Sequence, residues 1–468
     1  MIGEIYDMGP EDVDFLRRYL DYHPELKSSI RTQPPAVWFQ DRWKRIKEVR
    51  LLKTGVEFGI RGGRHLRFFP EKERAAVRQR FRTCFLNLLQ SRFPHWKTLK
   101  ILTGTDRNRH QTAALLRLHL WDGRHHLAAV AVYPGETAEL TDRVLSSAIL
   151  WWDHLRSKGC VDRILIFIPE CWSTRLLSAF PRLDLPLTCY EYQLEEESGR
   201  DYRPKPQLRK IYPHLVKSSE LGKPYVIFPY REDVAVLLHQ IKQEHPLLHL
   251  SFRHGRWELS LRGLRIVWHD NNTDQCFFNL ADPCLLTAST WADFEEHLER
   301  VSQVRCFPPT QPKHLYYCVA QERWLESLIL SDHSIFNADF VDVVYSQVPT
   351  YLDGERKVLD LLTATKDGRL AVLELKVDKD LDLIFQALDY WERVWHHLKQ
   401  GDFQRAGYFP KMTLSRESPL LYLISPLFEF HRVMPVLRKY LKEEIELKCV
   451  GINSDWKREL TILRKFEF

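Results

Sequence analysis

The chain has 468 residues, enough for two to four domains, and its 44% hydrophobic and 28% charged residues are the composition of an ordinary globular protein. No apolar run reaches the ~18 residues that a membrane span needs, and the acidic start MIGEIYDMGPEDVD is unlike a secretory signal. A net charge of +6 permits nucleic-acid binding without requiring it.

The nine cysteines are dispersed, with no C-x-x-C pair and no Cys/His spacing typical of zinc. Such a set fits buried free thiols in a reducing compartment. We therefore expect a cytoplasmic protein with no membrane partner.

Residues 1 to about 60 mix short helical patterns with basic and aromatic residues, and Lys and Arg are dense from Trp43 to Arg82. This interleaving is typical of a surface that follows a phosphate backbone and stacks bases. It is equally typical of solvated helix faces packed by aliphatic stems. The sequence leaves both alternatives open for this stretch.

From Glu71 the sequence predicts an α/β unit that contains a hairpin turn at Asp122-Gly123-Arg124. The pattern indicates a helix at 71–93, three strands within 98–133, a helix at 140–159, a strand at 163–169, a helix at 174–180 and a strand at 187–195.

A charged, proline-containing stretch from Glu195 to Lys217 has the composition of a linker. A smaller α+β unit follows from about Gly222 to Pro312, and a proline cluster at 308–314 marks its end.

Three histidines of this middle unit, His245, His249 and His254, invite a metal interpretation. However, Pro246 opposes the continuous helix that would place the first two on one face. We expect structural histidines instead.

The last segment begins with a predicted helix at 321–330 and a strand at 341–349 that Pro349 ends. On this helix Glu322 and Glu326 share one face, and they are either functional acids or solvated charges. Later in the segment the pattern predicts a strand at 419–426, a helix at 431–441, and strands at 445–452 and 459–466.

Between these elements, apolar strand-like runs at 358–364 and 370–377 flank an Asp-Gly turn, which is a strong hairpin signal. Because side chains alternate across a strand, Glu374 and Lys376 point to the same face. Hairpin pairing could bring the carboxylate of Asp360 near Glu374. Two carboxylates and a lysine on one face predict a divalent-metal site, and the alternative is an ion pair on a partly solvated strand.

Magnesium chemistry suits this group, because Mg²⁺ takes one or two carboxylates and keeps waters and substrate phosphate. A metal-bound water is easier to deprotonate, and the ion stabilises charge on a phosphodiester under attack. A nearby lysine can orient that water, act as a base, or stabilise the developing charge.

A helical pattern from Asp380 to Leu398 places Gln386 and Tyr390 four residues apart on one face. Asp360, the E-x-K of residues 374–376 and this Q-x-x-x-Y pair resemble, in that order, the PD-(D/E)xK nuclease superfamily and its RecB-type members. The resemblance covers roughly Gln321 to Phe468. It departs from the family before Asp360, where Leu359 replaces the usual proline.

The resemblance implies a restriction-endonuclease-like α-β-β-β-α-β core and an (endo)nuclease that uses Mg²⁺ or Mn²⁺ to hydrolyse phosphodiester bonds, of DNA rather than RNA. The implied metal ligands are Asp360 and Glu374, assisted by Glu326. Lys376 would position the attacking water. Gln386 and Tyr390 would fix the substrate backbone or the orientation of the lysine.

Two other functions remain open, a nucleic-acid-binding protein that keeps the fold and has lost turnover, and a protein-interaction scaffold. The presence of Asp360, Glu374 and Lys376 together argues against the loss of turnover.

The element order from Glu71 repeats the C-terminal order, and the Asp-Gly-Arg turn recurs at 367–369. When the two patterns are aligned, the N-terminal unit has residues without metal-binding groups at the positions that are functional in the C-terminal unit. It places Ala131 at Glu374, Tyr133 at Lys376, Ser147 at Gln386 and Trp151 at Tyr390.

We therefore expect a mixed α+β protein with three parts: a nuclease-like domain without metal ligands at 1–200, a linker and α+β middle domain at 201–312, and the nuclease domain at 313–468. The inactive copy could bind substrate or support a homodimer. The alternative is that α/β order is generic and the second turn is a coincidence.

Overall fold

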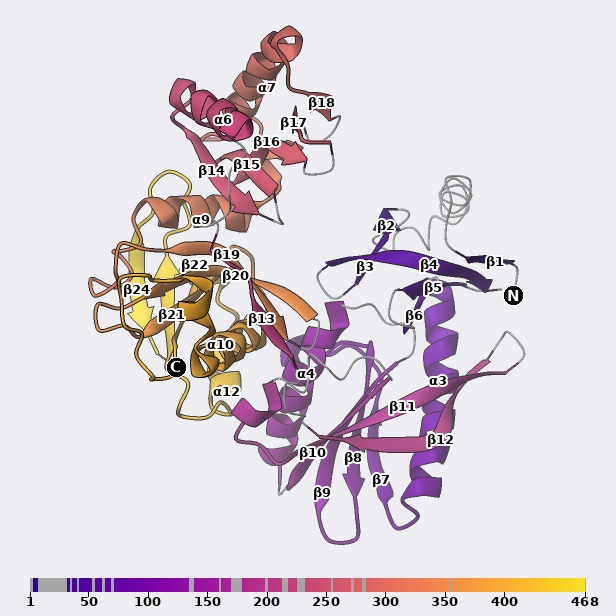
Figure 1. Cartoon of the computed structure of the whole chain (residues 1–468). Helices are drawn as coiled ribbons and strands as arrows, with labels where there is room; N and C mark the ends of the chain where they lie inside the picture. Colours follow the sequence, from indigo (N-terminus) through magenta and orange to yellow (C-terminus); the bar gives the residue numbers. More distant parts are fainter. Residues whose placement is uncertain are drawn as a thin grey trace. The chain divides into compact units, whose positions relative to one another are not determined.

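The computed structural model divides the chain into two compact units, Met1–His214 with Pro435–Lys442 and Leu215–Met434 with Glu443–Phe468 (Figure 1). Helices alternate with mixed sheets, so the expected mixed α/β class is confirmed. The structure describes residues 3–6, 32–33, 36–39, 42–52, 55–60, 64–68, 71–133, 139–159, 161–169, 179–197, 201–212, 218–224, 232–253, 256–270, 273–279, 283–352 and 355–467.

The described residues before 70 form a small sheet. Its strands follow the order β2-β3-β4-β5-β6, and β1 pairs with β4. The helical interpretation of the first 60 residues is therefore wrong where the structure describes them. The basic residues at 42–52 form a strand because they pair with β3 and β5, and this tertiary context outweighs their local preference. The strands are β1 (Gly3–Tyr6), β2 (Thr32–Gln33), β3 (Ala36–Phe39), β4 (Arg42–Leu52), β5 (Gly55–Ile60) and β6 (Arg64–Phe68).

A larger mixed sheet completes the first unit, with the strand order β12-β11-β10-β9-β8-β7. Successive pairs from β7 to β12 run antiparallel, antiparallel, parallel, parallel and antiparallel. The predicted helix at 174–180 falls almost entirely outside the described residues. The elements are α3 (Glu71–Arg92), β7 (Lys97–Leu102), β8 (Leu115–Trp121), β9 (His126–Val132), α4 (Glu139–Arg156), β10 (Arg163–Pro169), β11 (Leu187–Glu197) and β12 (Asp201–Ile211).

The linker predicted from Glu195 to Lys217 is wrong in its described part, because β12 pairs with β11 along Asp201–Ile211. The charges and prolines that indicated a linker are compatible with an edge strand. β12 is an edge strand of this sheet, where proline and charge are tolerated.

The middle part of the second unit is an antiparallel sheet of order β14-β15-β16-β17-β18 packed with two helices. Arg305 follows the second helix and is fully buried, and it donates hydrogen bonds to the carbonyls of Arg262, Val319 and Ala320. The elements are α6 (Glu232–Glu244), β14 (Leu248–Arg253), β15 (Arg256–Leu261), β16 (Leu264–Asp270), β17 (Gln275–Phe278), β18 (Cys284–Leu285) and α7 (Trp291–Val304).

The C-terminal sheet has the order β13-β19-β20-β21-β22-β23-β24. From β19 to β24 its pairs run antiparallel, antiparallel, parallel, parallel and antiparallel, the same succession as from β7 to β12. Its elements are β13 (Ser219–Leu221), α8 (Leu315–Cys318), α9 (Gln321–Ser331), β19 (Tyr345–Leu352), β20 (Glu355–Ala364), β21 (Leu370–Leu375), α10 (Leu383–Gln400), α11 (Asp402–Ala406), β22 (Leu420–Pro426), α12 (Met434–Arg438), β23 (Leu447–Ile452) and β24 (Ile462–Phe466).

Two local features of this sheet bear on the site. The predicted end of a strand at Pro349 is wrong, because β19 runs through Pro349, which lies opposite Val358. The predicted hairpin between β20 and β21 is confirmed, and it turns at Gly368 with φ +88°. A Cβ atom there would lie 2.2 Å from the carbonyl oxygen of Thr413, so both backbone angle and space require glycine.

Candidate metal centre

Asp360 and Glu374 stand opposite each other at the end of the hairpin that joins β20 and β21. The backbone pairs run from Ala364–Leu370 to Leu361–Leu373, and the next rung in this register holds the two acids. Directly opposed residues of an antiparallel pair share a face. At this rung the backbone N–H of Leu375 donates to Oδ2 of Asp360 over 3.1 Å, so this carboxylate lies where strand pairing ends.

Glu326 of helix α9 is a third acid of this region, and it is only 1% exposed. Its carboxylate is held by two consecutive residues of β19. The hydroxyl of Ser346 donates to Oε1, and the amide Nε2 of Gln347 donates to Oε2 over 3.3 Å. The same amide nitrogen lies 3.4 Å from Oδ1 of Asp360, so Gln347 bridges the helical and the strand carboxylates.

Lys376 follows β21 and continues its pairing, because its N–H donates to the carbonyl of Ile424 over 3.0 Å. Its Nζ lies 3.6 Å from Oε1 of Glu322 and 3.7 Å from Oδ2 of Asp380. The sequence left Glu322 as either a functional acid or a solvated charge. In the structure it pairs with Lys376.

Glu374 is 2% exposed, and its Oε2 is a buried oxygen that accepts no hydrogen bond within the described part of the chain. Burial first, and then the charge of Asp360, raise the pKa of Glu374 well above its usual value. Burial and the charge of Glu326 likewise raise the pKa of Asp360 to about 7, against the N–H of Leu375, which lowers it. Burial and neighbouring acids therefore favour the protonated, neutral forms of Asp360 and Glu374.

The pKa of Lys376 is raised although burial alone would lower it, because Glu322, Asp380, Glu374 and Asp360 all favour its charged form. A lysine held in this way carries a proton at neutral pH. Of the roles open to it, this environment favours orientation and charge stabilisation over that of a base.

These residues fit a hard divalent cation. Glu326 and Asp360 share the amide of Gln347, one oxygen of Glu374 is buried and unpaired, and the charge of Asp360 raises the pKa of Glu374. As the side chains stand, the ligand oxygens of the three acids do not all lie within 4.8 Å of one another, so binding of an ion would draw them closer. Oxygen donors of this kind are the ligands that Mg²⁺ and Mn²⁺ prefer. A cation would supply the charge that the protein leaves uncompensated.

Gln386 and Tyr390 lie four residues apart on α10, and both are partly exposed. The contacts described above come from α9, β19, β20, β21 and Asp380, so the roles of these two residues stay predictions. Sequence reasoning missed Gln347 and Ser346. The only signal was a polar pair inside an otherwise apolar strand.

The sheet of the first unit has a different chemistry at the matching rung. Its register places Leu116 opposite Ala131, and Tyr133 follows two residues later. All three belong to one buried hydrophobic cluster with Phe81 and Phe85 of α3. The positions that hold carboxylates and a lysine in the C-terminal sheet are thus filled by apolar packing here.

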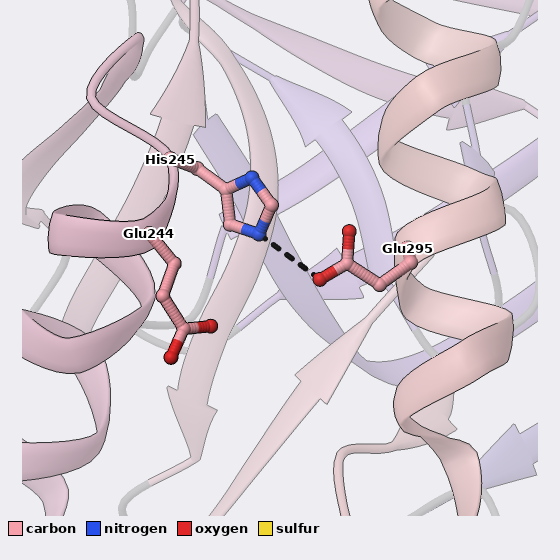
Figure 2. A group of neighbouring side chains, drawn as sticks. All are labelled: Glu244, His245 and Glu295. Carbon is pink, nitrogen blue, oxygen red and sulfur yellow. Dashed lines mark hydrogen bonds and ion pairs between the residues drawn. The ribbon is translucent and has the colours of Figure 1, made fainter.

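A second group of potential ligands lies in the middle part, where Nε2 of His245 is 3.1 Å from Oε1 of Glu295 and near Glu244 (Figure 2). His245 also packs edge-on against the ring of Phe294. Within the described residues this is the group whose three potential ligand atoms all lie within 4.8 Å of one another, so the expected structural role of His245 stays a prediction, and His254 lies outside the described residues. The carboxylates face solvent, which can balance their charge, so this group lacks the unpaired buried oxygen that marks the first site.

The chain matches no family model and no curated protein. Among the described residues, helices long and apolar enough to cross a membrane are absent.

Proposed function

We propose that the C-terminal part of this chain is a divalent-metal-dependent nuclease of the PD-(D/E)xK, restriction-endonuclease-like superfamily. The observation that carries the proposal is the unpaired buried oxygen of Glu374, whose pKa is raised by burial and by the charge of Asp360. It is supported by the order of α9, β19, β20, β21, α10 and β22, which follows the α-β-β-β-α-β core of that superfamily.

Asp360 and Glu374 would hold Mg²⁺ or Mn²⁺, with Glu326 taking part directly or through water. The bound ion would lower the pKa of a water and stabilise charge on the phosphodiester. Lys376, kept cationic by its acidic neighbours, would orient the attacking water and stabilise the negative charge that develops on phosphorus-bound oxygens. Gln386 and Tyr390 would position the lysine or the nucleic-acid backbone, with DNA the favoured substrate over RNA.

The sheet from β7 to β12 would be a second copy of the same fold without metal ligands. The identical succession of strand directions and the apolar rung at Leu116 and Ala131 support this assignment. Such a copy would bind substrate or support a homodimer rather than cut.

Cleavage assays with Mg²⁺ or Mn²⁺ on single-stranded and duplex DNA, and on RNA, test the proposal. We expect Lys376→Ala to slow cleavage by about 100-fold, because it removes the charge that faces the reacting phosphate. Lys379→Ala is the matched control, since Lys379 is an exposed lysine three residues away, and it should cut like the parent. Equal cutting by Lys376→Ala and the parent would refute the role of Lys376.

The rival function is a nucleic-acid-binding protein without turnover, which the apolar rung of the first unit makes a concrete alternative. Calorimetric titration with Mn²⁺ separates the two. A chain that binds DNA, gives no heat with Mn²⁺ and cuts nothing would support the binding protein. Heat that disappears in Glu374→Gln would support the nuclease.

A further inference from the structure

Gln347 has a backbone conformation that a strand residue rarely adopts. Its φ is +53°, in the left-handed region that favours glycine. The flanking pairs Ser346–Leu361 and Val348–Leu359 keep one register, and the rung between them would hold Gln347 and Asp360. Strain of this kind persists only where the surroundings enforce it, and it concentrates at functional sites.

The left-handed backbone has a direct consequence for the side chains. Successive side chains of a regular strand point to opposite faces, so two neighbours cannot ordinarily reach one group. Here Ser346 and Gln347 donate to the two oxygens of the same carboxylate, that of Glu326. The strained φ is what allows consecutive residues of β19 to hold one helical acid.

The amide of Gln347 also connects two elements of the site. A side-chain amide nitrogen carries two hydrogens and can therefore donate to two acceptors at once. Nε2 lies 3.3 Å from Oε2 of Glu326 and 3.4 Å from Oδ1 of Asp360. A neutral donor thus links the acid of α9 to the acid of β20, two groups that would otherwise repel each other.

We propose that Gln347 is a positioning residue of the candidate metal centre, whose amide bridges the carboxylates of Glu326 and Asp360 and keeps them next to each other for a divalent cation. This inference rests on the proposed metal site. It adds a residue that reaches the ion only through its ligands. Without the amide, the two acids move apart and the cation must bring them together at the cost of affinity.

Calorimetric titration with Mn²⁺ tests this role in the full chain. We expect Gln347→Ala to weaken Mn²⁺ binding by about tenfold or more, the usual effect of losing a residue that orients metal ligands. Gln347→Gly removes the same amide but relaxes the backbone, so it should weaken binding by a similar factor even if the alanine variant folds poorly. Glu326→Gln should weaken binding too, and in combination with Gln347→Ala it should add little, because both changes disrupt one unit.

A positioning role changes the Mn²⁺ concentration needed for half-maximal rate and leaves the rate at saturating Mn²⁺ nearly unchanged, whereas a purely structural role would not separate the two. In cleavage assays Gln347→Gly should need more Mn²⁺ for half-maximal rate, while its rate at saturating Mn²⁺ returns to within about threefold of the parent. Wild-type affinity for Mn²⁺ in both Gln347 variants, or additive effects of Gln347→Ala and Glu326→Gln, would overturn the inference. A parent that binds Mn²⁺ but cuts no nucleic acid would refute the nuclease and leave Gln347 to be decided by affinity alone. A parent that binds no Mn²⁺ would overturn both.

Discussion

Asp360→Asn should stabilise the metal-free protein at alkaline pH while removing the proposed metal binding. In the unfolded chain this carboxyl ionises near its ordinary pKa of 3.8, whereas burial and Glu326 raise its folded pKa to about 7. Between these values the folded state keeps a proton that the unfolded state has lost, so the free energy of unfolding falls as pH rises. The raised pKa of Glu374 acts in the same direction.

The cost of ionising Asp360 in the fold is complete above about pH 7. Since each pKa unit corresponds to about 1.4 kcal/mol, the change from 3.8 to about 7 amounts to up to about 4 kcal/mol. The asparagine carries no charge and escapes this cost. It keeps an oxygen that can accept from the N–H of Leu375, which donates to Asp360 over 3.1 Å. Its NH2 group cannot accept from Nε2 of Gln347 as Oδ1 of Asp360 does, and the loss of that bond subtracts about 1 kcal/mol. We therefore expect a gain of a few kcal/mol at about pH 8 and little difference at about pH 4.

Urea unfolding at both pH values measures this difference, and hydrogen exchange of peptides from Glu355 to Lys376 reports it locally. Added Mn²⁺ should stabilise the parent at about pH 8 and leave the variant unchanged, because only a folded site that binds the ion gains from it. The reasoning is refuted if Asp360→Asn destabilises the protein equally at both pH values, since that would mean the acid is a structural partner rather than an uncompensated charge.

Two further predictions concern stability. Asp389→Ala should cost about 3–5 kcal/mol in urea unfolding, because it leaves the buried cations Lys357 and Arg393 without the carboxylate that pairs with both, and an unchanged midpoint would contradict this. Gln347→Gly should be about 1 kcal/mol more stable than Gln347→Ala in the same assay, since both lose the amide and only glycine accepts the φ of +53° without strain, so equal stabilities would show that the backbone relaxes on substitution.

Much of the C-terminal fold follows from short-range patterns. Alternation fixed the relation of Glu374 to Lys376, and the Asp-Gly turn fixed the register that places Asp360 opposite Glu374. Both depend on residues close in sequence, which is why periodicity and turn chemistry predict them. Glu326 was expected at the site only through the family resemblance, with a solvated helix charge as the alternative, and the structure buries it in contact with Ser346 and Gln347.

What the sequence did not predict depends on distant partners. The strand β12 looks like a linker until β11 is present to pair with it, and β4 looks helical until β3 and β5 flank it. The left-handed φ of Gln347 has no local signal, because nothing in the letters Ser-Gln-Val distinguishes a strained strand residue from a regular one. Its cause lies in an acid 21 positions earlier in the chain, Glu326.

The sheets β7–β12 and β19–β24 have the same succession of parallel and antiparallel pairs, so their residues at one rung can be compared for stability. At one rung Leu116 and Ala131 pack into an apolar cluster, whereas at the matching rung Asp360 and Glu374 are buried acids, each with a raised pKa. An apolar pair at that place would be more stable, because burying an unpaired carboxylate is unfavourable whereas burying a methyl group is favourable. The buried acids at one rung, and the strained Gln347 that holds Glu326 beside them, lower stability, and the proposed metal site gives this cost a reason, since strain and raised pKa values concentrate at functional sites.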